Sequence, residues 1–243
     1  MTDEQPLSGA GWARVEGIPE FDPAKLRFKA VPFGRTSGRK FSWRNRGVLP
    51  PVADQGEHQT CFSHSLVAAL RARRQIVEAP IPPLDAEMFH ACTMGLPLSQ
   101  GNYLVKRSLD NLCDVGAPRA GSGYAPGLAC KDFTPSVVRA ASYNSASTPE
   151  LVKGILATYA PLVALVSAGE SLKHIRDDSI YRDQIGEAKT FNHAMLLIGY
   201  DDEEQCWIVQ NSMGSRWGQK GFGRIAYGSA SILVGDFWCY VVE

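Results

Sequence analysis

The amino-acid sequence predicts an α+β fold built from two lobes with a cleft between them. Two observations lead to this class. Apolar residues recur at helical spacing in the first half of the chain, whereas short apolar or alternating runs bounded by turn residues dominate the second half. A length of 243 residues suffices for one large domain or two small lobes. We place an N-terminal arm at residues 1–40, a mostly helical lobe at about 41–145 and a mostly β lobe at about 146–243.

The helical elements follow from apolar spacing and from start and stop signals. Helices are expected at residues 61–78, from about residue 85, at about 103–114 and from residue 149, with a loop at 116–132. Pro80 stops the first helix, and Asp85 supplies an acidic residue for the first turn of the second. Thr148 predicts the cap of the last helix, since a proline and a glutamate follow it. The arm is rich in glycine, proline and charge and is expected to be a loop rather than a folded unit.

The second half contains short segments that are typical of strands. They are apolar, alternating or rich in aromatic residues, and turn residues separate them. Strands are expected at residues 162–166, 195–200, 206–209, 222–227 and 237–242.

Charge and hydropathy exclude several classes of partner. The chain has 25 basic and 25 acidic side chains, so nothing favours binding to nucleic acid or to an anionic membrane. No segment reaches the roughly 18 apolar residues that span a bilayer, because Pro161 interrupts the best candidate. The N-terminus lacks the basic and apolar parts of a secretory signal. We therefore expect a monomer that is cytoplasmic as written, and export by another route stays open.

One cysteine, one histidine and one asparagine form the strongest functional pattern. Cys61 begins the first predicted helix, and His193 and Asn211 follow it by 132 and 150 residues. These residue types can supply a thiolate, a general base and a group that orients the base, the combination that cleaves acyl bonds. Gln55, six residues before the cysteine, could donate a hydrogen bond to the oxyanion that forms during attack.

The position of Cys61 explains how its thiol could become reactive. A thiol has an unperturbed pKa near 8.5 and is mostly protonated at neutral pH. The helix N-terminus and an imidazolium at His193 would both stabilise the thiolate. Asn211 would fix the tautomer of His193. The backbone N–H of Cys61 and the amide of Gln55 would then bind the developing oxyanion.

Several ordered motifs make the chain resemble the papain-like, cathepsin-type cysteine peptidases of the C1 family. The resemblance covers residues 41–243, which we assign as the peptidase domain, and includes the family spacing of about 130–150 residues between cysteine and histidine or asparagine. The motifs are Phe41-Ser42-Trp43-Arg44, Pro51-Val52-Ala53-Asp54-Gln55-Gly56, Cys61-Phe62-Ser63, Asn192-His193-Ala194, Gly199-Tyr200, Trp207-Ile208-Val209-Gln210-Asn211-Ser212, Gly214-Ser215-Arg216-Trp217-Gly218 and Gly221-Phe222-Gly223-Arg224-Ile225.

The resemblance implies a peptidase with a helical lobe, a β-barrel-like lobe, a polypeptide substrate and no cofactor or metal. It assigns Cys61 as nucleophile, His193 as base, Asn211 as orienter and Gln55 as oxyanion donor. Trp217 would shield the His–Asn pair. Substrate-binding residues are expected to be Gly101, Leu165, Phe191, Asn192, Ala194, Trp217 and Asp236. The pocket lined by Leu165, Phe191 and Ala194, with Asp236 near its base, predicts modest apolar side chains at the second position before the cut.

The chain departs from the family pattern at several positions. His58 replaces the usual cysteine three residues before the nucleophile, so one family disulfide cannot form. Phe62 and Met213 replace tryptophans, and the substrate-binding glycine pair is reduced to Gly101 within Gln100-Gly101-Asn102. The long inhibitory prosegment is expected to be missing. Cys92 and Cys130 occupy positions where the family often has a pair, but we expect free thiols because nothing in the chain signals export.

Three alternatives stay open from the sequence. The same fold could bind peptides without hydrolysing them, or the thioester could be passed to another acceptor, as in an acyltransferase or amidase. His58, Cys61 and His64 also have a spacing that could hold a metal ion, with a fourth ligand from His90 or Cys92.

Overall fold

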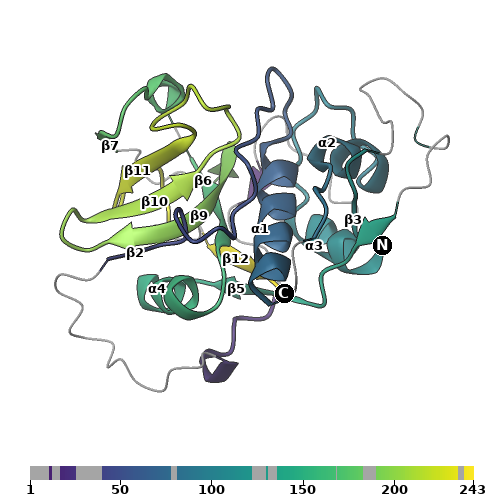
Figure 1. Cartoon of the computed structure of the whole chain (residues 1–243), viewed down its shortest axis with the longest axis horizontal. Coiled ribbons are helices and arrows are strands. Elements are labelled where there is room, and N and C mark those ends of the chain that lie inside the picture. The colour runs from purple at the N-terminus through teal and green to yellow at the C-terminus, as the bar shows by residue number, and fades with distance from the viewer. Residues whose placement is uncertain are drawn as a thin grey trace.

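The structure is a computed structural model that describes residues 11–12, 17–25, 40–77, 81–121, 130, 136–167, 169–182, 190–234 and 238–243. Its helical segments are η1 (Pro23–Lys25), α1 (Cys61–Val77), α2 (Ala86–Met88), the π-helical η2 (Phe89–Thr93), α3 (Val105–Asp114), α4 (Pro149–Thr158) and η4 (Glu170–His174). Its strands are β1 (Gly11–Trp12), β2 (Lys40–Ser42), β3 (Ala117–Pro118), β4 (Val137–Val138), β5 (Tyr143–Ala146), β6 (Leu162–Val166), β7 (Ile180–Tyr181), β8 (Thr190–Phe191), β9 (His193–Asp201), β10 (Cys206–Gln210), β11 (Phe222–Ala226) and β12 (Cys239–Val242). In Figure 1, α1, α2 and α3 lie together on one side and β9, β10 and β11 on the other, which confirms the predicted α+β class.

A large mixed sheet forms the core of the strand-rich half. The strand order is β5-β12-β6-β9-β10-β11-β7, with β2 paired to β9, and only β11 and β7 pair in parallel. The continuous apolar run of β6 is buried along its whole length, as expected for a central strand. The order runs from β5 to β7 without closing among the described strands, so the barrel-like lobe that the sequence predicted is a large sheet and not a closed barrel.

The predicted strands all have counterparts in the sheet, and β6 has the predicted ends. β9 begins at His193, earlier than expected, and β12 is described from Cys239 onwards. The sequence analysis did not predict β2, β5 and β7 as strands, and all three join the large sheet. β5 is short and polar, so its sequence carries no alternating pattern.

Helix α1 lies beside the sheet and contacts β9. Leu66, Ala69 and Leu70 are at most 1% exposed and form the apolar stripe that the sequence predicted. The stripe packs against β9, β12 and β6, which explains why the helix forms. This packing fixes the first residue of α1, Cys61, relative to the first residue of β9.

The other helices begin close to their predicted starts. Thr148 caps α4 by accepting a hydrogen bond from the Leu151 N–H at 3.3 Å, and Pro149 is the first helical residue. Asp85 caps α2 in the same way through the Met88 N–H at 2.8 Å. The expected second helix is therefore present, but it is three residues long and continues into the π-helical turn η2.

Residues 17–25 of the predicted arm are docked on the folded core. Ile18 and Phe21 are buried, and the Phe21 ring meets the Tyr159 ring edge-on at a centroid distance of 5.0 Å. Lys25 pairs with Glu243 at 2.8 Å. β1 pairs antiparallel with β8, two residues before His193. This part of the arm therefore belongs to the packed structure, in contrast to the loop that the sequence predicted.

The expectation of free thiols at Cys92 and Cys130 was wrong. The two residues form a disulfide that ties η2 to a position 38 residues later. The missing export signal had favoured free thiols, but the family resemblance predicted the bond correctly.

Within the described residues, no helix combines the length and apolar character that crossing a membrane requires.

Candidate active site

Cys61, the predicted nucleophile, is the first residue of α1 and is partly exposed. Its side chain is hydrogen-bonded to His193, and the backbone groups of Ala194 and Phe62 also hydrogen-bond to the sulfur. Cys61 belongs to the helix and His193 to the sheet, so the sulfur lies where the two halves of the molecule meet.

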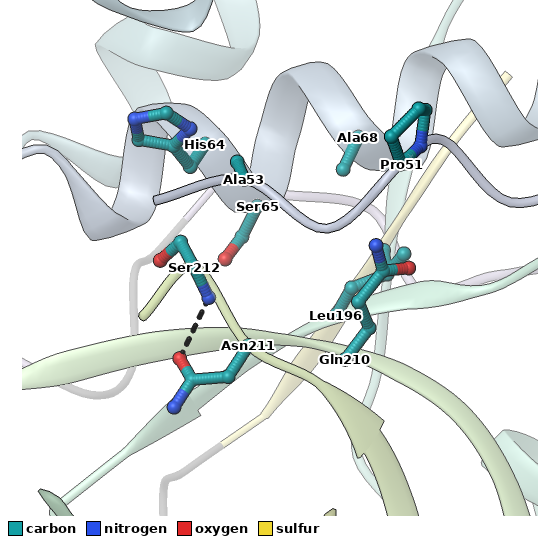
Figure 2. A pocket seen from close by; sticks show the side chains of 9 residues that line it. All are labelled: Pro51, Ala53, His64, Ser65, Ala68, Leu196, Gln210, Asn211 and Ser212. Carbon is teal, nitrogen blue, oxygen red and sulfur yellow. Dashed lines mark hydrogen bonds between the residues drawn. The ribbon is translucent and has the colours of Figure 1, made fainter. Parts of the chain in front are cut away.

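His193 and Asn211 form the second part of the site. The His193 Nε2 lies 2.8 Å from the Asn211 Oδ1, and both side chains are buried. An amide oxygen can only accept, and this oxygen also accepts from the Ser212 N–H at 2.9 Å, as Figure 2 shows. Nε2 of His193 must therefore carry a proton, which leaves Nδ1 for the sulfur of Cys61.

The charges of Cys61 and His193 support each other. Burial raises the pKa of the Cys61 thiol, but the neighbouring His193 charge and hydrogen bond outweigh this effect and lower the pKa below its ordinary value. Burial lowers the pKa of His193, but the Cys61 charge and the bonds to Cys61 and Asn211 reverse this and raise it. Both directions favour a thiolate–imidazolium pair, the form in which sulfur is a strong nucleophile.

The Gln55 side chain is linked to Asn211 through Ser212 and is held by hydrogen bonds at both ends of its amide. Its Oε1 accepts from the Ser212 hydroxyl at 2.6 Å, and its Nε2 donates to the His58 carbonyl at 2.6 Å. The Gln55 N–H also donates to the Ser212 carbonyl at 2.8 Å. An amide nitrogen carries two hydrogens, so a second N–H is left for a substrate oxygen.

The structure buries the three side chains predicted to line an apolar substrate pocket. Leu165 and Ala194 are 0% exposed and pair across β6 and β9, and Phe191 is 1% exposed. The Phe191 ring contacts the rings of Phe62 and Tyr103 at centroid distances of 6.1 and 5.4 Å. All three side chains are buried, so they offer almost no surface to a ligand.

Three of the remaining predicted substrate residues, Asn192, Gly101 and Trp217, differ in their exposure. Asn192 is exposed, and its N–H donates to the Val166 carbonyl at 3.0 Å. Gly101 is partly exposed, and a Cβ there would collide with the Tyr103 ring. Trp217 is buried and donates its indole N–H to the Leu172 carbonyl at 2.7 Å. Asp236 lies outside the described residues.

Sequence reasoning missed two residues of the site. Ser212 bonds to both Gln55 and Asn211 and so links the oxyanion side of the site to the histidine side. Its position directly after Asn211 was visible, but a hydroxyl carries no distinctive signal by itself. Tyr103 contacts Phe191, and burial together with the Cys61 charge raises the pKa of its phenol.

A small cavity lies on the other side of Asn211, between α1 and the sheet (Figure 2). Its volume is about 30 Å³. It is lined by Pro51, Ala53, His64, Ser65, Ala68, Leu196, Gln210, Asn211 and Ser212. This space suffices for about two water molecules and is too small for a large peptide side chain.

The metal-site alternative has no support in the described part of the chain. Those residues contain no group of three or more His, Cys, Asp or Glu side chains placed to hold a metal ion. His58 is bonded to Glu87 at 2.6 Å, and burial lowers the pKa of His64 to about 4. Neither histidine is paired with Cys61.

Comparison with known proteins decides the family. Residues 37–240 match the model of the papain family cysteine protease, which is well over half of the chain. The chain belongs to the papain family of cysteine proteases. The papain-family fold is also seen in solved structures at 20% sequence identity. A cysteine protease of Carica candamarcensis in complex with E-64 superimposes with a TM-score of 0.70, covering 84% of this chain and 97% of the other. Digestive procathepsin L 3 of Tenebrio molitor gives a TM-score of 0.74, covering 90% and 74%.

Curated relatives in the papain family also match most of this chain, but the match covers only part of their own length. Cysteine proteinase 2 of Leishmania pifanoi is 24% identical over 95% of this chain and 53% of its own length. Human cathepsin O is 26% identical over 89% of this chain and 74% of its own length. The chain thus spans about half the length of the Leishmania relatives that it matches.

Proposed function

We propose that the chain hydrolyses peptide bonds through a thioester acyl-enzyme, with Cys61 as nucleophile and His193 as proton carrier. The observation that carries this proposal is the hydrogen bond between Cys61 and His193 together with the 2.8 Å bond from His193 to Asn211, and the opposite directions of the two pKa shifts support it. Membership of a protease family and the names of the relatives support a polypeptide as substrate.

The geometry suggests a role for each group in the reaction. The Cys61 thiolate attacks the substrate carbonyl, and the carbonyl π electrons move to its oxygen. The free N–H of Gln55 and the backbone N–H of Cys61 donate to this oxyanion, and each donor of this kind contributes about 2.7–4 kcal/mol. His193 gives its proton to the departing amine as the C–N bond breaks. It then takes a proton from water, whose oxygen attacks the thioester and releases the acid and the thiolate.

Burial of the predicted pocket changes the expected specificity. Because Leu165, Ala194 and Phe191 are buried and the Phe191 ring packs on Tyr103, we infer that the corresponding substrate position accepts only small side chains. A peptide library should show glycine or alanine there, and Phe191→Ala should extend the preference to larger apolar residues. A wild type that prefers large aromatic residues would contradict this inference.

Active-site labelling separates a hydrolase from a peptide-binding protein. Iodoacetamide at pH 6 should alkylate Cys61 in the wild type, and mass mapping should find Cys113 unlabelled. Cys113 is the matched control because it is partly exposed, but burial and the acidic residues Asp114 and Asp110 raise its pKa. Peptide hydrolysis should disappear in Cys61→Ala and fall by orders of magnitude in His193→Ala.

Two results would reject parts of the proposal. Equal labelling of Cys61 and Cys113 at pH 6 would mean that no thiolate–imidazolium pair exists. Labelling of Cys61 without hydrolysis of any peptide in a library would favour transfer of the acyl group to another acceptor.

A further inference from the structure

We propose that Glu87 is a positioning residue for the oxyanion donor Gln55 and that it acts through His58. The inference rests on the proposed function, because Gln55 has a catalytic task only if a carbonyl is attacked at Cys61. Glu87 lies on α2, well separated in sequence from Cys61 and His193. No sequence motif pointed to it.

The first step is the contact between Glu87 and His58. The Glu87 Oε1 lies 2.6 Å from the His58 Nδ1, and the two side chains are 25% and 36% exposed. The carboxylate is held on α2, whose start is fixed by the Asp85 cap. Because a carboxylate only accepts, the proton of this bond belongs to Nδ1 of His58.

The second step leads from His58 to Gln55. The His58 carbonyl accepts from the Gln55 Nε2 at 2.6 Å, and the His58 N–H donates to the Gln55 carbonyl at 3.0 Å. The other side of the same peptide plane, the Gln59 N–H, donates to the Leu98 carbonyl at 2.8 Å. The direction of the His58 carbonyl therefore sets which hydrogen of the Gln55 amide is used and which points to the substrate.

The third step fixes the opposite end of the amide. The Ser212 hydroxyl holds the Gln55 Oε1, so the amide is gripped from the sheet by Ser212 and from the helical half by His58. On the helical side, the turn that carries His58 includes Gly56 at a φ of +56°. Few residues other than glycine adopt a positive φ. Because glycine is also the most flexible residue, the turn relies on contacts from neighbouring side chains to stay in one conformation. Glu87 supplies one such contact through a side chain of the turn.

The test compares Glu87→Ala with Glu87→Gln, whose amide oxygen can still accept from His58. The matched control is Glu57→Ala, which removes a carboxylate from an exposed position of the same turn. Two quantities are measured in the full chain: the ¹⁵N–¹H signals of the Gln55 side-chain amide, and kcat and KM for a peptide substrate. The same kinetics are repeated in a Gln55→Ala background.

We expect Glu87→Ala to move the Gln55 amide signals and to lower kcat about fivefold with KM nearly unchanged. This is far below the 10²–10³-fold loss for a deleted oxyanion donor, because Ser212 still holds the amide. Glu87→Gln should restore most of the loss, and Glu57→Ala should behave as wild type. In the Gln55→Ala background, Glu87→Ala should have no further effect on kcat.

Several outcomes would overturn the inference. Gln55 amide signals that do not move in Glu87→Ala would show that Glu87 does not position this group. An equal fivefold loss in the Gln55→Ala background would show that Glu87 acts only on general stability. A wild type that hydrolyses no peptide would instead contradict the proposed function, while the amide signals would still decide whether Glu87 positions Gln55.

Discussion

His64 should make the fold less stable in mild acid. It lies on α1 beside the small cavity, and its Nε2 is buried without a hydrogen-bond partner among the described residues. Burial lowers the pKa of His64 to about 4; the Glu87 carboxylate opposes this shift, and the nearby His90 and His58 reinforce it. The same histidine has its ordinary pKa near 6.5 in the unfolded chain.

The sign and size of the effect follow from proton binding. Above pH 6.5 His64 is neutral in both states and does not affect the free energy of unfolding. Between pH 6.5 and 4 the unfolded chain takes up a proton that the folded chain refuses, so stability falls as the pH falls. The full loss is about 3.4 kcal/mol, from 2.5 pK units at 1.36 kcal/mol each, and about 2 kcal/mol is reached at pH 5.

Urea unfolding at pH 7.5 and pH 5.0 measures this effect. The comparison uses Cys61→Ala with and without His64→Leu, so that self-digestion and the titration of the Cys61–His193 pair are removed from both proteins. We expect the loss of stability between the two pH values to be about 2 kcal/mol smaller in the His64→Leu variant. His174→Leu is the matched control, since the His174 side chain is 69% exposed. An unchanged pH dependence in the His64→Leu variant would refute the reasoning.

Three further predictions concern stability and use urea unfolding in the same inactive background. Lys153→Ala should cost about 3–5 kcal/mol, because Lys153 pairs with the buried Asp202 at 2.6 Å and its loss leaves a buried charge; adding Asp202→Asn should recover much of the cost. Cys92→Ser should cost about 4 kcal/mol from the loop entropy of the 38-residue separation to Cys130, and a reducing agent should lower the stability of the parent by a similar amount. Phe21→Ala should cost about 3–5 kcal/mol, because its ring is 1% exposed; a cost below 1 kcal/mol would show that the arm is not part of the fold.

Local patterns predicted the framework of the fold. The α1 stripe, the Thr148 cap and the apolar run of β6 each carry a signal that depends on few neighbours, and each appears where it was expected. β5 could not be predicted, because its polar residues become a strand only through pairing with β12. The open edge of the sheet depends on the same long-range pairing and is invisible to periodicity.

The candidate site shows a similar division. The residue types and spacing of Cys61, His193 and Asn211 pointed to one reaction centre, and the structure brings these three residues together. The pocket prediction did not foresee that Phe191 would pack on Tyr103, because a sequence does not show which of several apolar side chains fills a space. The contact of Glu87 with His58 was equally hidden, since two charged residues 29 positions apart carry no pairing signal.

The division of the site between helix and sheet has a consequence for the newly made chain. The sulfur at position 61 leaves the ribosome long before the imidazole at 193 and the amide at 211 have been synthesised. β12, which is synthesised after both of its neighbours, must insert between β5 and β6 before the sheet is complete. Until then the thiol has no partner to take its proton. The nascent protein therefore cleaves neither other proteins nor its own chain.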